Sequence, residues 1–190
     1  MDDHSQPTFI DRLFRRVSGS PLPETPEQWQ NLLHQAVERG ALDADTAQRL
    51  TKTLAFGSLN VRDAMMSRAQ MNVVKATDSI ERIIDYAVET AHSRFPVIAE
   101  DKDHVIGILH AKDLLKYTLS PDQFRLENIL RPAVFVPESK PLHSLLKEFQ
   151  TQHNHMAIVV DEYGGISGLV TFEDVIEQIV GKIEDEFDED

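Results

Sequence analysis

The seven residues Gly168-Leu169-Val170-Thr171-Phe172-Glu173-Asp174 decide how we interpret this chain. They read as the end of an apolar strand, a threonine, and the start of a helix. Thr171 and Asp174 fit the capping-box pattern, in which Ser or Thr is followed three residues later by an acid, just before an apolar run. On one interpretation, Thr171 only caps the helix. On the other, the helix N-terminus and its hydroxyl face the phosphate of a nucleotide, and Asp174 accepts hydrogen bonds from ribose. These residues alone leave both interpretations open.

The pattern occurs twice in the chain. Gly107 precedes Gly168, and Asp113 precedes Asp174, by the same 61 residues. Apolar periodicity predicts a helix in each repeat, and each repeat also has three extended segments. The expected helices cover 79–91 and 140–152, and the expected strands cover 71–74, 95–99, 105–109, 133–136, 156–160 and 166–170. A unit of about 60 residues buries little surface alone, so the two repeats should pack as one module.

These elements predict an α+β fold with two β-α-β-β-α repeats, preceded by a helical hairpin. Thr25 should cap the first helix of this hairpin, with Pro26 at its first position, and Gly40 should end it. We divide the chain into a leader (1–25), the hairpin (26–59), a first repeat (60–119), a linker (120–125), a second repeat (126–183) and an acidic tail (184–190).

Composition excludes several classes of function. The chain has no cysteine, so it carries neither disulfides nor thiolate metal sites. Its formal net charge of −13 argues against broad nucleic-acid binding. No apolar run is long enough to cross a membrane, and no signal peptide opens the chain, so we expect a cytoplasmic location. His153 and His155 could share one side of an extended segment, but nothing at fixed spacing completes a metal site, and we expect none. No catalytic constellation is readable, so we expect no enzyme.

A family resemblance follows from the repeats and three further strings. The doubled unit closing with Gly-x-x-Thr-x-x-Asp resembles a pair of cystathionine β-synthase (CBS) domains, a Bateman module. The strings His92-Ser93-Arg94-Phe95-Pro96-Val97-Ile98, Arg131 to Lys140, and His155 to Gly165 are similar to the CorC group of magnesium and cobalt efflux proteins, which is related to the CNNM transporters. The resemblance covers about residues 25 to 187. It implies AMP, or ATP with magnesium, in the cleft between the repeats.

The resemblance also implies a set of binding residues. Thr171 would face phosphate, Asp174 would bind ribose, and four residues of the first repeat would line the other side. Arg94 offers a phosphate fork, unless it pairs with a surface acid. Phe95 and Pro96 offer an apolar wall for the base, unless they only pack within their strand. The expected site residues are Ser93, Arg94, Phe95, Pro96, Val136, Gly168, Thr171 and Asp174.

The chain departs from the family pattern at two places. His110 stands where the second repeat has Thr171, so we expect one good nucleotide site rather than two. Ser67 stands where the family often carries proline, which leaves open how the loop before the first repeat meets a ligand. Relatives commonly continue past Glu184-Asp185-Glu186, and the larger ones carry a transmembrane domain, so we expect that this chain alone does not move an ion.

We therefore expect a non-catalytic regulatory module that binds an adenine nucleotide and contributes to magnesium and cobalt efflux. The resemblance implies a homodimer formed through the CBS modules and a membrane transporter as partner, with the protein in the cytoplasm or peripheral at the inner membrane. The alternative is a scaffold that only dimerises and docks, with its cleft filled by side chains.

Overall fold

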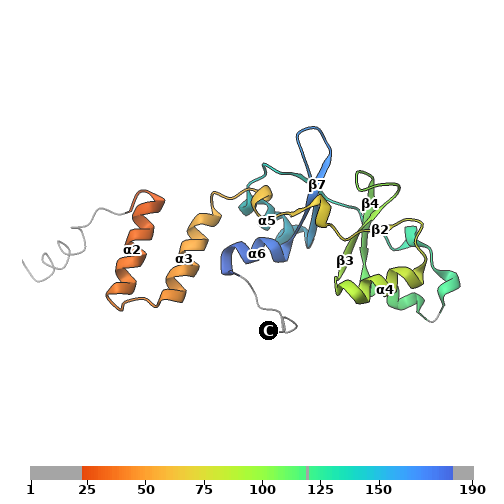
Figure 1. Ribbon diagram of the computed structural model, residues 1–190, viewed down its shortest axis with the longest axis horizontal. Helices are drawn as coiled ribbons and strands as arrows, with labels where there is room; N and C mark the ends of the chain where they lie inside the picture. The colour runs from red at the N-terminus through yellow and green to blue at the C-terminus, as the bar shows by residue number, and fades with distance from the viewer. Residues whose placement is uncertain (1–22, 119, 182–190) are drawn as a thin grey trace, which may run out of the picture. The chain divides into compact units, whose positions relative to one another are not determined.

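The computed structural model describes residues 23–118 and 120–181 (Figure 1). The chain divides into two compact units, Met1–Leu54 and Ala55–Asp190. In the first unit, helix α2 (Pro26–Glu38) begins as predicted, because Thr25 Oγ1 accepts a hydrogen bond from Gln28 N at 3.4 Å. Helix α3 (Ala44–Phe56) follows and ends in the second unit. Most of the leader and all of the acidic tail lie outside the described residues.

The second unit contains the two predicted repeats. The first consists of β2 (Val74–Lys75), α4 (Ile80–Thr90), β3 (Arg94–Ile98), β4 (Val105–His110) and the 3-10 helix η3 (Ala111–Tyr117). The second consists of β5 (Phe135–Pro137), α5 (Leu142–Gln152), β6 (Met156–Val160), β7 (Ile166–Thr171) and α6 (Phe172–Val180). Each repeat has one parallel strand pair, β2 with β3 or β5 with β6, followed by an antiparallel hairpin. The predicted α+β repeat is therefore confirmed.

A short segment precedes each repeat. The first contains η1 (Val61–Asp63), β1 (Met66–Ser67) and η2 (Arg68–Gln70), and the second contains η4 (Pro121–Gln123) and η5 (Leu126–Asn128). Both segments pair with the other repeat. Strand β1 is antiparallel to β7, and Arg131 forms a bridge with Ile108 of β4. The sheets are thus β2-β3-β4 and β1-β7-β6-β5. Because each segment crosses over, the two repeats interlock.

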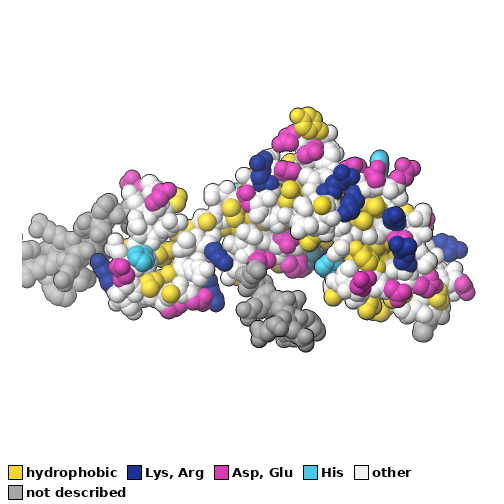
Figure 2. Space-filling model, in the orientation of Figure 1, with side chains coloured by type: hydrophobic (Ala, Val, Ile, Leu, Met, Phe, Trp, Pro, Cys, Tyr) yellow, Lys and Arg dark blue, Asp and Glu magenta, His cyan; other side chains and the backbone are white. Residues whose placement is uncertain are grey.

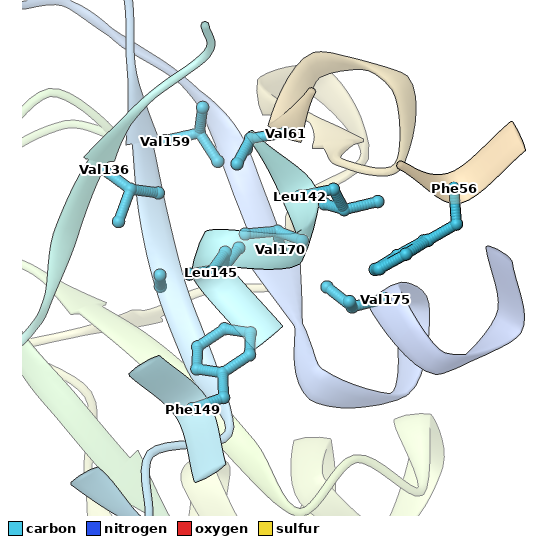
Figure 3. Packing of buried hydrophobic residues seen from close by; sticks show 10 residues of the cluster. Phe56, Val61, Val136, Leu142, Leu145, Phe149, Val159, Val170 and Val175 are labelled. Atoms are coloured by element: carbon cyan, nitrogen blue, oxygen red, sulfur yellow. The ribbon is translucent and has the colours of Figure 1, made fainter. Parts of the chain in front are cut away.

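Three clusters of buried residues hold this unit together. One lies under each sheet and its helices, and Figure 3 shows the cluster of the second repeat, where Phe56 and Val61 meet Leu142 and Val175. The third joins the two repeats through side chains from both. Its buried members are Met71, Ile108, Ile158, Ile166 and Leu169. Helices α4 and α5 bury the predicted apolar faces, with Ile80 and Ile83 in α4 and Leu142, Leu145 and Phe149 in α5.

The last helix differs between the repeats. Helix α6 begins with the predicted capping box, whereas η3 is a 3-10 helix and the His110 side chain makes no capping hydrogen bond. An imidazole in place of the threonine hydroxyl leaves the first N–H groups of η3 without that acceptor.

The surface carries charges of both signs. On the face drawn in Figure 2, Lys and Arg side chains are interspersed with Asp and Glu rather than gathered into a basic stripe. Within residues 23–118 and 120–181, every helix is too short or too polar to span a bilayer.

Candidate functional site

A cavity of about 310 Å³ opens where the two repeats meet. Its volume lies at the lower end of the range typical of small-molecule sites. The first repeat and its leading segment contribute Met66, Asn72, Ala91, His92, Ser93 and Arg94, and the second repeat contributes His155, Met156, Leu169, Thr171, Glu173 and Asp174. The lining thus combines apolar side chains with two carboxylates, a guanidinium, two imidazoles and two hydroxyls.

Strand β7 and helix α6 position the carboxylate and hydroxyl of the second repeat. Asp174 Oδ2 accepts hydrogen bonds from Thr171 N and Thr171 Oγ1, both at 2.7 Å. Thr171 Oγ1 in turn accepts from Asp174 N at 3.1 Å. Two of these three bonds use Oδ2 of the carboxylate, and none of them uses Oδ1. The capping box and a binding role for Asp174 are therefore compatible in this geometry.

A hydrogen-bond network fixes the opposite wall. Asn72 Nδ2 lies 2.8 Å from His92 Nε2, and Tyr86 donates its hydroxyl hydrogen to Asn72 Oδ1 at 2.8 Å. Ser93 and Arg94 follow directly, at the start of β3. Among the residues that the structure describes, Arg94 forms no ion pair, so its guanidinium is available to an anion in the cavity.

His155 also lines the cavity, although the sequence interpretation did not place it there. Its Nδ1 is buried and has no hydrogen-bond partner within the described residues, and it lies 3.8 Å from Glu173 Oε1. Most buried polar atoms in proteins have a hydrogen-bond partner, so this nitrogen is an exception. Within the described ranges, no group of three or more His, Asp or Glu side chains could hold a metal ion.

The eight expected site residues fall into two groups. Ser93, Arg94, Thr171 and Asp174 line the cavity. The other four are not among its lining residues: Phe95 and Val136 are buried in the cores of their repeats, and Pro96 is buried within β3. Gly168 pairs with Ser67, and a Cβ added to it would collide with the carbonyl oxygen of Met66.

Asn72, His92, Glu173 and Met66 also line the cavity and were not expected. His92 and Glu173 each adjoin an expected site residue in sequence, and this adjacency could have indicated that they line the cavity. Met66 gave none, because it reaches the cavity only through the crossover of β1. Asn72 gave none either, because nothing in the sequence indicated its hydrogen bonds with His92 and Tyr86.

The equivalent position in the first repeat has different chemistry. Arg131 Nη2 donates a hydrogen bond to Asp113 Oδ2 at 3.0 Å, and this bond holds the pKa of Asp113 below its usual range. Burial, with Arg131 and Arg94 nearby, lowers the pKa of His110 to about 4. At neutral pH, the first repeat therefore presents an uncharged imidazole and a carboxylate that is already paired.

Comparison with protein families gives two matches. A model described as the CBS domain matches residues 61–120 and 126–181, and one described as the N-terminal region of NMB0537 matches residues 21–51. Among curated proteins, the magnesium and cobalt efflux protein CorC of Vibrio cholerae is 44% identical over 98% of this chain and 64% of its own length. That of Escherichia coli K12 is 47% identical over 88% of this chain and 58% of its own length. The chain thus spans about three-fifths of these relatives.

Several solved structures are also similar to this chain. A functionally unknown conserved domain from Neisseria meningitidis MC58 is 67% identical, with a TM-score of 0.73, over 79% of this chain and 97% of that one. The CBS domain of a bacterial CNNM/CorC family Mg²⁺ transporter is 38% identical, with a TM-score of 0.76, over 87% and 100%.

Two similar structures contain a nucleotide. A CBS domain of the bacterial CNNM/CorC family in complex with ATP is 42% identical, with a TM-score of 0.67, over 71% of this chain and 96% of that one. A CBS-domain pair with bound AMP from Klebsiella pneumoniae is 31% identical, with a TM-score of 0.57, over 65% and 99%.

Proposed function

The chain belongs to the CBS-domain family, in the CorC/CNNM group, and on this basis we propose that it binds an adenine nucleotide in the cavity between its repeats. The observation that carries the proposal is the convergence of Thr171 and Asp174 from one repeat with Ser93 and Arg94 from the other around one cavity. The ATP and AMP complexes of its structural relatives support this choice of ligand.

Several lining groups have roles that follow from their chemistry. The carboxylate of Asp174 accepts hydrogen bonds from ribose hydroxyls, which are neutral donors well matched to a charged acceptor. Arg94 and the N-terminus of α6 face the phosphates. Met66, Met156 and Leu169 supply apolar contact for the base, while Phe95 and Pro96 support Arg94 from the core behind it. Glu173 lies in the same cavity, so a triphosphate would bind best with Mg²⁺, whose charge offsets the repulsion.

The proposed role is regulatory and non-catalytic. A nucleotide that contacts both repeats favours whichever packing of the repeats binds it better, and a partner can respond to that difference. We propose that the protein is cytoplasmic or peripheral at the inner membrane, and that its partner is a membrane transporter for magnesium and cobalt. The names of the curated relatives support this choice of ions.

Calorimetric titration tests the site. The parent and Asp174→Ala would be titrated with AMP and ATP, with and without Mg²⁺. Loss of a charged hydrogen-bond acceptor should weaken binding by tenfold or more, since such bonds contribute about 1.5–3 kcal/mol. Asp113→Ala is the matched control, because it removes the equivalent carboxylate of the first repeat and should leave affinity unchanged. Equal affinity of the parent and Asp174→Ala would contradict the assignment.

A ligand-free scaffold is the competing function, and two exposed apolar side chains favour an interface. Val88 on α4 is 76% exposed and Leu115 on η3 is 70% exposed. We propose that a homodimer forms through this helical face. Sedimentation should show dimers of the parent and monomers of Val88→Asp/Leu115→Asp, with Ile106→Asp as control.

Nucleotide at 100 times its dissociation constant should stabilise the protein by roughly 2.7 kcal/mol. The absence of any thermal shift would favour the scaffold.

A further inference from the structure

Met66 and Arg131 occupy equivalent positions in the two crossovers. Met66 pairs with Leu169 of β7, and Arg131 pairs with Ile108 of β4. Leu169 and Ile108 each stand one residue after the repeated glycine. The segment before the first repeat therefore brings Met66 to β7, which ends at Thr171. The segment before the second repeat brings Arg131 to β4, which ends at His110.

The glycines confirm this equivalence. A Cβ on Gly168 would collide with the carbonyl oxygen of Met66, and a Cβ on Gly107 would lie 2.9 Å from the carbonyl oxygen of Arg131. Both strands thus need glycine for the same reason, which is the close approach of the crossing backbone.

The two side chains differ at this shared position. Met66 lines the cavity, and among the described residues the Asp174 carboxylate is paired only with Thr171 of its own cap. Arg131 instead places its guanidinium 3.0 Å from Asp113 Oδ2. The side chain of Asp113 is 16% exposed and that of Arg131 is 50% exposed, so a mostly buried carboxylate is paired with a half-exposed guanidinium.

We propose that Arg131 is an internal occupant of the first repeat's nucleotide position and thereby restricts the chain to one nucleotide. The inference rests on the proposed function, since it assumes that the second repeat's site binds nucleotide. The guanidinium and the carboxylate are both charged and belong to one chain, whereas a ribose hydroxyl is neutral and must first displace the guanidinium. His110 adds a second obstacle, because its side chain has no hydroxyl to offer a phosphate.

Exchanging the side chains tests the proposal. His110→Thr/Arg131→Met gives the first repeat the residues found in the second, and Met66→Arg gives the second repeat the guanidinium of the first. Arg82→Met is the matched control: it breaks another Arg–Asp pair, Arg82 Nε to Asp78 Oδ1 at 3.5 Å, whose carboxylate side chain is also 16% exposed. Thermal melting of each variant establishes that it folds. Arg131→Gln, which keeps a polar side chain but no charge, replaces Arg131→Met in the double variant if the latter does not fold.

Equilibrium dialysis and calorimetry with ATP and Mg²⁺ would count the nucleotides bound per chain. We expect one for the parent and Arg82→Met, two for the double variant, and at least tenfold weaker binding by Met66→Arg. One nucleotide on a folded double variant would overturn the inference and leave the proposed function intact. Two nucleotides on the parent, with one lost in the double variant, would make Arg131 a ligand rather than an occupant. No binding by the parent would reject both the proposed function and the inference.

Discussion

His110 shows how far one residue difference between the repeats changes the site. The register pairs Arg94 with His110 in the first repeat and Met156 with Thr171 in the second. The imidazole is therefore held beside a guanidinium on its own sheet and beside Arg131 from the crossing segment. Its environment disfavours the protonated form, through burial first and through these two cations second.

This environment predicts a pH dependence of stability. The folded chain binds the His110 proton with a pKa of about 4, below the ordinary histidine pKa of 6.5, so it binds fewer protons than the unfolded chain between these values. Stability should therefore fall as the pH drops from about 6.5 to 4. Urea denaturation at pH 7 and pH 5 should show a smaller loss for His110→Gln than for the parent, by on the order of 1 kcal/mol after solvent screening is considered.

His104 provides a control of opposite sign. The hydrogen bond to Asp101 raises the pKa of His104, so its contribution to stability is present at low pH and is lost as the pH rises through the folded pKa. His104→Gln should thus increase the loss between pH 7 and pH 5. Parallel pH profiles for all three proteins would contradict this account of His110.

The strands and helices show what the sequence could predict. The 61-residue spacing predicted two equivalent units, and the apolar stripes of α4 and α5 predicted which faces are buried. The crossover of β1 was not predictable, because a two-residue strand has no periodicity and its partner lies about 100 residues away. Phe95 illustrates a second limit: β3 is buried on both faces, so no alternation distinguishes a cavity wall from a core position.

The close approach of β1 to β7 makes Gly168 a sensitive position. Gly168→Ala should push β1 away from β7 and cost about 1–3 kcal/mol of stability, as overpacking usually does. Because Met66 of β1 lines the cavity, nucleotide affinity should fall as well. Urea denaturation and calorimetry measure the two effects.

Gly107→Ala separates the two effects. It meets the carbonyl oxygen of Arg131 at 2.9 Å, so a similar loss of stability is expected. It should nevertheless retain nucleotide affinity, because the proposed site uses the other crossover. A fully stable Gly168→Ala, or equal losses of affinity in the two variants, would show that the contact at β1 does not shape the cavity.

The interlocked repeats should unfold as one cooperative body. The sheet of the second repeat includes β1, which precedes the first repeat, and β4 of the first repeat forms a bridge with Arg131, which precedes the second. Ile158 lies fully buried in the cluster that joins the two repeats. Neither repeat can lose its structure without exposing that shared surface. Ile158→Ala should therefore destabilise both repeats together, by about 2–5 kcal/mol, the usual cost of truncating a buried isoleucine.

Hydrogen exchange along a urea titration, followed separately in β3–β4 and β6–β7, measures this coupling. Both hairpins should lose protection at one urea concentration in the parent, and at one lower concentration in Ile158→Ala. Leu50→Ala, at a side chain of α3 that is 42% exposed, should change stability by no more than about 0.5 kcal/mol. If β6–β7 lost protection in Ile158→Ala while β3–β4 kept that of the parent, the repeats would be independent domains. A nucleotide bound between them could then report only on their contact, and not on the stability of the pair.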